Sequence, residues 1–233
     1  MDIDGARFLV VGGSGVLGGL ISRSLVDAGA RVVVTGRDPY RLAEVAAAAG
    51  TEPITLDVVD VEACAAAVGT AIERLGGLDG LVVATGVPAF GPALETEAAV
   101  AEELFAVNAL GPMALLRAAA PALKESSGGV AVVLSAILAD LPTNQMADYS
   151  ASKAALSAWL GVVRRENRRR FRVVDVRPPH LDTGLAEHPL AGAAPKLPEP
   201  LAGSAVVDAV LEALRGEASE IVWDPKAIEL VLR

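Results

Sequence analysis

Residues 11–18, with the sequence VGGSGVLG, decide how this chain folds. They follow the apolar run Arg7–Val11 and open a segment in which Leu17, Ile21 and Leu25 recur about once per helical turn. Glycine permits a tight turn and a close approach of backbone to a pyrophosphate, and the following helix N-terminus offers free N–H groups. The stretch therefore predicts a dinucleotide site between a first strand and a first helix. The contacts expected from this turn come from Gly12, Ser14, Gly15, Val16 and Leu17.

Short β-branched runs recur along the chain, and each interval between them leaves room for a helix. The runs expected to form strands are Arg7–Val11, Arg31–Thr35, Pro53–Leu56, Gly80–Val83, Val130–Leu134, Phe171–Val176 and Glu220–Trp223. Their apolar residues are continuous rather than alternating, which is typical of strands covered on both faces. The repetition predicts the α/β class, with a doubly wound, mainly parallel sheet of about seven strands and helices on both faces. We find no internal repeat or linker, so residues 1–233 are expected to form a single domain.

The composition disfavours several classes of protein. Acidic residues number 29 against 20 basic ones, and the net charge of −9 disfavours binding to nucleic acids or anionic membranes. With one cysteine, Cys64, and two histidines, His180 and His188, we expect neither an intramolecular disulfide nor a His/Cys zinc site. The N-terminus lacks the pattern of a signal peptide, and we find no apolar run of the roughly 18 residues that a membrane span needs. These features predict a cytoplasmic protein without a membrane, nucleic-acid or metal partner.

The end of the second strand bears on the choice of dinucleotide. An acid is expected there for the free 2′-hydroxyl of NAD, but this chain has Gly36 followed by Arg37. A guanidinium suits the 2′-phosphate of NADP, so NADP is favoured and NAD is left open. Asp38 could still meet a ribose, but it precedes Pro39, and that pair is typical of a helix N-cap followed by proline.

A proline-rich segment at residues 178–200 is the only long candidate loop. Loops of this length in a compact domain are usually functional lids or disordered segments. We expect this one to be a substrate lid.

Tyr149 and Lys153 lie near the start of a helical run that continues through Leu156 and Trp159. A spacing of four residues places the phenol and the ammonium on one helix face. An isolated tyrosine keeps its proton at neutral pH, whereas a nearby ammonium favours the phenolate and lowers the pKa. The pair is therefore predicted to exchange a proton with a substrate oxygen.

In combination these features resemble the short-chain dehydrogenase/reductase family over nearly the whole chain. The matching elements occur in the family's order: Gly12, Gly15 and Gly18, then Asp57 and Val58, Asn108, Tyr149 with Lys153, and the stretch from Pro178 to Thr183. The resemblance implies a Rossmann-like domain with its nicotinamide between the carboxyl edge of the sheet and Tyr149. It also implies a homodimer or homotetramer.

The resemblance further implies a role for each matching residue. Asp57 and Val58 would bind the adenine, while Thr183, after Pro178, would contact the carboxamide. Lys153 would hold the ribose hydroxyls as well as tune Tyr149. Asn108 would hold a water in the proton relay.

Three positions depart from the family pattern without touching the chemistry. Val11 replaces a threonine, Pro179 replaces a glycine, and residues 83–86 replace the motif Asn-Asn-Ala-Gly. The residues of that motif still expected beside the cofactor are Ala84, Thr85 and Gly86.

A fourth departure concerns the mechanism. Ala136 occupies the place of the family's catalytic serine, thirteen residues before Tyr149. Ser135 comes one residue earlier, and a bulge at the strand end would turn its hydroxyl into the site. Without such a bulge the protein is slow, uses a different donor or has lost catalysis.

The sequence thus predicts an NAD(P)-dependent oxidoreductase that reduces a carbonyl, or oxidises an alcohol, on a small organic substrate. The catalytic residues expected are Tyr149, Lys153, Asn108 and Ser135. One alternative is a non-catalytic NADP-binding sensor, which Ala136 would favour. A second is a methyltransferase on a Rossmann-like fold, which Arg37 opposes because an acid should then end the second strand.

Overall fold

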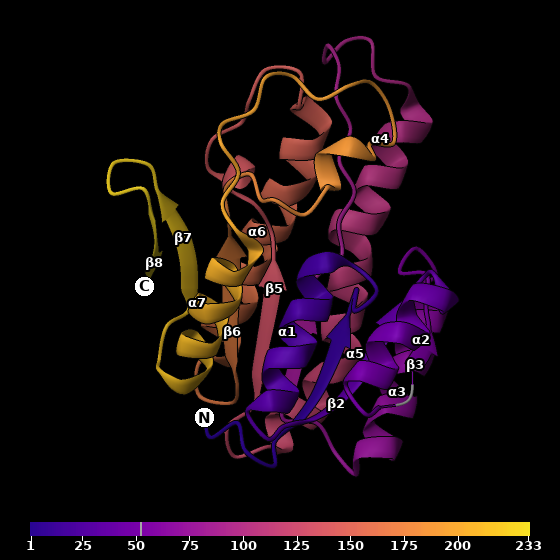
Figure 1. The fold of residues 1–233 in the computed structure, drawn as a ribbon, viewed down its shortest axis with the longest axis vertical. Coiled ribbons are helices and arrows are strands. Elements are labelled where there is room, and N and C mark those ends of the chain that lie inside the picture. The colour runs from indigo at the N-terminus through magenta and orange to yellow at the C-terminus, as the bar shows by residue number, and fades with distance from the viewer. Residues whose placement is uncertain (52) are drawn as a thin grey trace.

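The computed structural model describes residues 1–51 and 53–233, and its centre is a twisted eight-stranded sheet (Figure 1). The strands are β1 (Arg7–Val11), β2 (Arg31–Gly36), β3 (Pro53–Thr55), β4 (Gly80–Val83), β5 (Val130–Leu134), β6 (Arg172–Arg177), β7 (Glu220–Asp224) and β8 (Glu229–Leu232). Their order is β3-β2-β1-β4-β5-β6-β7-β8. All pairings from β3 to β7 are parallel. The chain winds outward in both directions from β1 and β4, which confirms the predicted doubly wound α/β fold.

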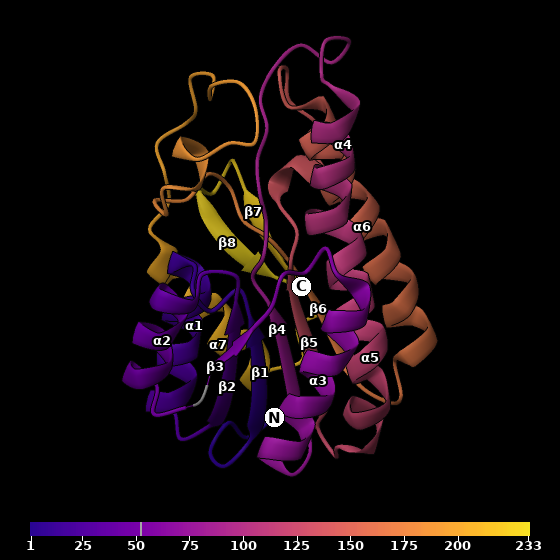
Figure 2. The ribbon, with the colours of Figure 1, turned by 90° about the vertical axis from the view of Figure 1, so that its right-hand side faces the viewer.

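Helices cover both faces of this sheet (Figure 2). They are α1 (Val16–Asp27), α2 (Pro39–Ala48), α3 (Val61–Leu75), α4 (Ala98–Phe105), α5 (Gly111–Glu125), α6 (Ala147–Asn167) and α7 (Gly203–Arg215). One apolar core lies between the sheet and α3, α5 and α6, and a second lies between the sheet and α1, α2 and α7. Alternate residues of each central strand enter opposite cores, so the continuous apolar runs are explained by burial on both faces.

The eighth strand was not predicted. β8 pairs antiparallel with β7 after a tight turn, in which the Asp224 carboxylate accepts hydrogen bonds from the Lys226 and Ala227 backbone N–H groups. Ile228 adopts a φ of +57° at the end of that turn. An isoleucine in the left-handed region is uncommon, and this is why the sequence pattern gave little sign of a hairpin.

Residues 98–125 form one long helix in which α4, a π-helical turn at Ala106–Leu110 and α5 follow without a break. By length and composition alone this helix could cross a membrane, so our expectation that no run reaches that length was wrong. In the fold it packs against α3 and α6, and Leu104, Leu115 and Leu123 are fully buried there. It is therefore a core helix of this domain, and the π-helical turn contains Asn108.

Candidate functional site

The glycine-rich turn joins β1 to α1 where the carboxyl ends of β1 and β4 meet. Gly12 has a φ of +86°, and a Cβ atom there would lie 2.8 Å from the Ala84 carbonyl oxygen. Ala84 N–H in turn donates to the Val11 carbonyl at 2.8 Å. Any side chain at position 12 would therefore force the two strand ends apart, and glycine leaves the backbone open to a ligand.

The N-terminus of α1 is free to receive an anion. Gly15 is the N-cap residue, no side chain caps the helix and its first turn contains no acid. Nearby, the Thr85 hydroxyl is buried and has no hydrogen-bond partner in the described part of the chain. Uncapped N–H groups and an unsatisfied buried hydroxyl fit the pyrophosphate and nicotinamide ends of a dinucleotide.

The end of β2 lies directly beside this turn. A Cβ atom at Gly36 would collide with the Ser14 hydroxyl, so these two residues are in close contact. Arg37 follows, is exposed and makes no hydrogen bond or ion pair with residues 1–51 or 53–233. Asp38 is engaged elsewhere, since its carboxylate accepts from the Tyr40 and Arg41 N–H groups and caps α2. The end of β2 thus offers the Ser14 hydroxyl and, after Gly36, a guanidinium that is free among the described residues.

Two predicted residues from separate segments, Lys153 and Asn108, meet at a third, Gly86. A Cβ atom at Gly86 would lie 3.1 Å from Lys153 Nζ and 3.4 Å from Asn108 Oδ1. The Asn108 amide is fixed by two hydrogen bonds of 2.9 Å with the Val87 backbone. It also donates to Ser152 Oγ at 3.1 Å, and Ser152 donates to the Tyr149 carbonyl at 2.8 Å. The π-helical turn is therefore tied to the first turns of α6.

Burial controls the ionisation of the Tyr149–Lys153 pair. It raises the pKa of Tyr149 to about 12 and lowers the pKa of Lys153 to about 8, with the Asp175 carboxylate partly opposing the second shift. The predicted direction for the pKa of Tyr149 was wrong, because removal from water raises it. Lys153 Nζ donates to the Leu134 carbonyl at 3.1 Å.

The predicted bulge at the end of β5 would have to free the Ser135 hydroxyl, which is engaged in the structure. Ser135 Oγ donates to Asp175 Oδ1 at 2.5 Å, and both side chains are buried. A serine has one hydroxyl proton, so this bond must break before Ser135 can donate to a substrate carbonyl. Ala136 follows in an extended conformation and offers no donor from its side chain.

The remaining predicted residues also lie at the carboxyl edge of the sheet. Asp57 is exposed beyond β3 and accepts from Val59 N–H, while the Val58 carbonyl packs against Gly111 at the start of α5. The Pro178 carbonyl accepts a hydrogen bond from the Ile137 backbone N–H. Thr183 and Leu17 approach each other at Gly203, where a Cβ atom would lie 3.8 Å from a methyl group of each.

The proline-rich segment arches over this edge (Figure 1). Backbone hydrogen bonds of 2.8 and 3.0 Å join Leu201 to His180 and Asp182 and close its base. Near its tip, Leu190 N–H donates to Pro88 and Phe90 N–H donates to Ala191, both at 2.9 Å. The segment is thus attached to the loop that follows β4.

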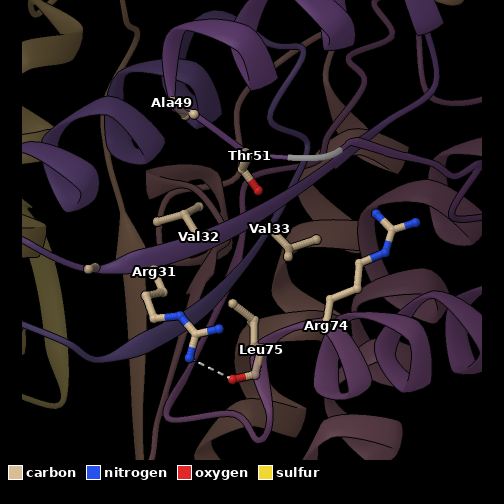
Figure 3. A pocket seen from close by; sticks show the side chains of 9 residues that line it. Arg31, Val32, Val33, Ala49, Thr51, Arg74 and Leu75 are labelled. Carbon is tan, nitrogen blue, oxygen red and sulfur yellow. Dashed lines mark hydrogen bonds between the residues drawn. The ribbon is translucent and has the colours of Figure 1, made fainter.

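Two cavities accompany these features. One of about 440 Å³ lies beside Tyr149, between the start of α6, the loop after β4 and residues 190–192. The other, of about 490 Å³, lies at the opposite edge of the sheet between Arg31, Thr51 and Arg74 (Figure 3). There Arg31 donates to the Leu75 carbonyl at 2.9 Å. Only the first cavity adjoins the site around Gly86.

Four residues near the site were missed in the sequence. Ser152 and Ser157 lie on α6 beside Tyr149 and Lys153, and Asp175 and Arg177 come from β6. Asp175 carried a signal, because an acid inside the apolar run 171–176 must be buried with a partner. The partners themselves come from other strands and helices.

The fold and this edge define a dinucleotide-binding α/β protein with a tyrosine–lysine pair. A sequence model described as short chain dehydrogenase matches residues 7–191. An uncharacterized oxidoreductase of Staphylococcus saprophyticus is 31% identical over 206 residues, which cover 85% of this chain and 88% of that protein. Dehydrogenase/reductase SDR family member 7B of Danio rerio is 30% identical over 68% of this chain, and the match spans 55% of that longer relative.

A solved structure agrees over nearly the whole chain. The short chain dehydrogenase from Burkholderia cenocepacia, in complex with NADP, is 32% identical with a TM-score of 0.84, covering 97% of this chain and 91% of that one. The chain therefore belongs to the short-chain dehydrogenase/reductase family of NAD(P)-dependent oxidoreductases. Membership of this family removes the methyltransferase alternative.

Proposed function

We propose that this protein reduces a carbonyl on a small organic substrate with NADPH, or oxidises the corresponding alcohol with NADP. One observation carries the proposal: Lys153 and Asn108 meet around Gly86, next to the glycine-rich turn. Lys153 lies on the same helix as Tyr149. Bound NADPH would supply the hydride. Everything else in the reaction falls to side chains of this chain.

The preference for NADP is supported by the end of β2. Arg37 is exposed and unpaired among the described residues, and Ser14 lies against Gly36 next to it. A phosphate monoester is bound well by a guanidinium and a hydroxyl, whereas a free ribose hydroxyl gains little from the positive charge. The NADP in the Burkholderia relative agrees with this assignment.

Tyr149 is assigned the proton transfer. Its raised pKa keeps the phenol protonated at neutral pH. A group that donates a proton to a developing alkoxide must be protonated beforehand. Lys153 lies one turn further along α6 and would hold the ribose hydroxyls, while its charge stabilises the phenolate left after transfer. Asn108 is held rigidly by Val87 and would position a water of the proton relay.

The missing serine makes substrate activation the weak point of the site. Ala136 has no donor, and Ser135 gives its proton to Asp175. Loss of one preorganised donor costs about 10²–10³ in rate in other enzymes. We therefore propose slow turnover with simple carbonyls, with Tyr149 as the main donor to the substrate oxygen.

The substrate is assigned to the cavity beside Tyr149, with residues 178–200 as its lid. The base and the tip of that segment are held by backbone hydrogen bonds to Leu201 and to the loop after β4. A homodimer or homotetramer in the cytoplasm remains a prediction.

The proposal is tested by titrating the protein with NADPH and then measuring NADPH oxidation across a carbonyl panel. The Tyr149→Phe variant should bind NADPH as the wild type does and lose about 10²–10⁴ in turnover, the usual range for a lost general acid. Tyr40→Phe is the matched control, because Tyr40 is 84% exposed and is the other tyrosine of the chain.

Wild-type binding without turnover of any carbonyl or alcohol would favour the non-catalytic sensor. Equal turnover of the wild type and Tyr149→Phe would remove Tyr149 from the chemistry.

A further inference from the structure

Asp175 is the most completely enclosed carboxylate in the described chain that the reaction does not use. It lies in β6 with no exposed surface, opposite Val133 of β5. Three groups donate to it: Ser135 Oγ and Ser157 Oγ, each at 2.5 Å, and Arg177 Nη1 at 2.8 Å. These donors come from the end of β5, from α6 and from β6, so one carboxylate joins the three elements that frame the site.

The charges around Asp175 do not balance without Lys153. Arg177 pairs with Asp175 at 2.8 Å, with Asp140 at 2.9 Å and with Glu220 at 3.2 Å. Arg164 also pairs with Glu220, at 3.0 Å. Two guanidinium groups thus face three carboxylates, which leaves one negative charge in excess.

Lys153 is placed to supply the missing positive charge. Tyr149, Lys153 and Ser157 follow one another at intervals of four residues on α6, so they form a row on one helix face. Ser157 ends this row by donating to Asp175. Lys153 is 3% exposed, and its Nζ is bonded to Leu134, the neighbour of Ser135.

We propose that Asp175 is a positioning residue of this site, which holds α6 against the ends of β5 and β6 and keeps Lys153 charged. The idea rests on the proposed function of Tyr149 and Lys153. Burial strongly disfavours an isolated ammonium, and a fixed carboxylate behind it offsets part of that cost. The effect of Asp175 on the pKa of Lys153, which it raises against burial, agrees with this role.

The hydrogen bond to Asp175 explains why Ser135 does not act as the catalytic serine. Its hydroxyl belongs to the Asp175 cluster, defined as Asp175 with Ser135, Ser157 and Arg177. In this arrangement Ser135 supports Lys153 from behind and does not face the substrate oxygen as a donor. Ser135 therefore does not supply the hydroxyl that Ala136 lacks.

The test compares the pH dependence of NADPH affinity and of turnover in Asp175→Asn and the wild type. Asparagine keeps the shape and removes the charge, so Lys153 should lose its proton at lower pH. The high-pH limb of both profiles should then move down by at least about half a pH unit. Charged groups that face the cluster from other elements are Asp140, Glu220 and Arg164, and they are unchanged in this variant.

The matched control is Asp79→Asn. It removes a partly buried carboxylate that accepts several hydrogen bonds at the opposite edge of the sheet. It should lower the thermal unfolding temperature and leave both pH profiles in place. A merely structural Asp175 would behave in the same way.

Arg177→Gln provides a second test of opposite sign. Removing this cation leaves more uncompensated negative charge near Lys153, so the high-pH limb should move up. This variant decides the question if Asp175→Asn does not fold.

Profiles of either variant that superimpose on an active wild type overturn the role of Asp175 and leave the proposed function intact. Failure of the wild type to bind NADPH overturns both.

Discussion

The two edges of the sheet both hold ionisable side chains, but the protein shifts the pKa values of these side chains in opposite senses at the two edges. At the amino edge, Asp79 accepts from Arg7 Nε, Arg7 Nη2 and Ser126, at 2.7 to 2.8 Å. The hydrogen bond from Arg7 holds the pKa of Asp79 at about 2, and Asp79 raises the pKa of Arg7. Both shifts favour the charged forms, so this ion pair stabilises the fold.

At the carboxyl edge the shifts have the opposite sense. Burial raises the pKa of Tyr149 and lowers the pKa of Lys153, so both shifts act against the charged forms, although Lys153 stays mostly charged at neutral pH. Arg37 is unpaired among the described residues, and Thr85 has an unsatisfied hydroxyl. The carboxyl edge thus contains unpaired and unfavourably buried polar groups, which lower the stability of the fold but leave side chains available to a ligand. Functional sites commonly show this combination.

Among the variants that compare the two edges, the largest effect is expected at Arg37, which is unpaired among the described residues. Arg37→Ala should weaken NADPH binding by about 10–100-fold, the value of one hydrogen bond to a charged group, while NADH binding changes little. Fluorescence titration with both dinucleotides measures this, and Arg165→Ala, at an exposed position near the end of α6, is the control. Equal losses for the two dinucleotides would show that Arg37 does not contact the 2′-phosphate.

Next in size is Asp79, at the amino edge. Asp79→Asn should lower the free energy of unfolding at neutral pH by about 2 kcal/mol, with turnover unchanged. The folded pKa lies below the ordinary value of 3.8, so this stability is present above about pH 4 and is lost as the pH falls toward 2. Urea unfolding along a pH series should therefore show the wild type and the variant converging in acid.

Exposed Asp208 provides the control for that series, since Asp208→Asn should unfold like the wild type at every pH. A constant gap between Asp79→Asn and the wild type would mean that the charge of Asp79 contributes nothing.

Lys153 should also gain stability as the pH rises, but at higher pH and for a different reason, because burial disfavours its charged form. Its folded pKa of about 8 lies below the ordinary 10.5, so the fold is destabilised below pH 8 and regains stability as the pH rises toward 10.5. Between about pH 8 and 10 the wild type should gain about 1–2 kcal/mol relative to Lys153→Met, measured by urea unfolding. Lys124→Met, at an exposed position of α5, should show no such trend. Parallel curves for the wild type and Lys153→Met would contradict the assignment.

The smallest effect is expected from restoring a donor. Ala136→Ser should raise turnover about fivefold, because a new hydroxyl without its supporting contacts recovers only part of a preorganised donor. Steady-state rates are compared with those of Ala139→Ser in the same loop, which should match the wild type. A fall in the rate of Ala136→Ser would show that the site is adapted to alanine.

Local patterns were sufficient for much of the fold. Continuous β-branched runs, helical spacing and the glycine-rich turn predicted strands β1 to β7, with small shifts at the ends of four of them. β8 was missed, because its turn depends on the Asp224 cap and on the left-handed Ile228. The long helix at 98–125 was underestimated because its apolar residues are interrupted by polar ones.

The candidate site divides in the same way. Spacing on one helix predicted the Tyr149–Lys153 pair, and the family resemblance supplied Asn108, which the fold brings to within van der Waals reach of the same glycine. Neither could show the hydrogen bond from Ser135 to Asp175 or the direction of the Tyr149 pKa. The first depends on a partner 40 residues away in the chain, and the second depends on burial.

The amino-acid sequence by itself determined the class of fold and the glycine-rich turn of a dinucleotide-binding protein, because these follow from periodicity and from short-range spacing. Only the tertiary structure decided which groups are charged and which hydroxyls are free. Those properties depend on how completely water is excluded and on which side chains three separate elements bring together, and no local pattern encodes either one.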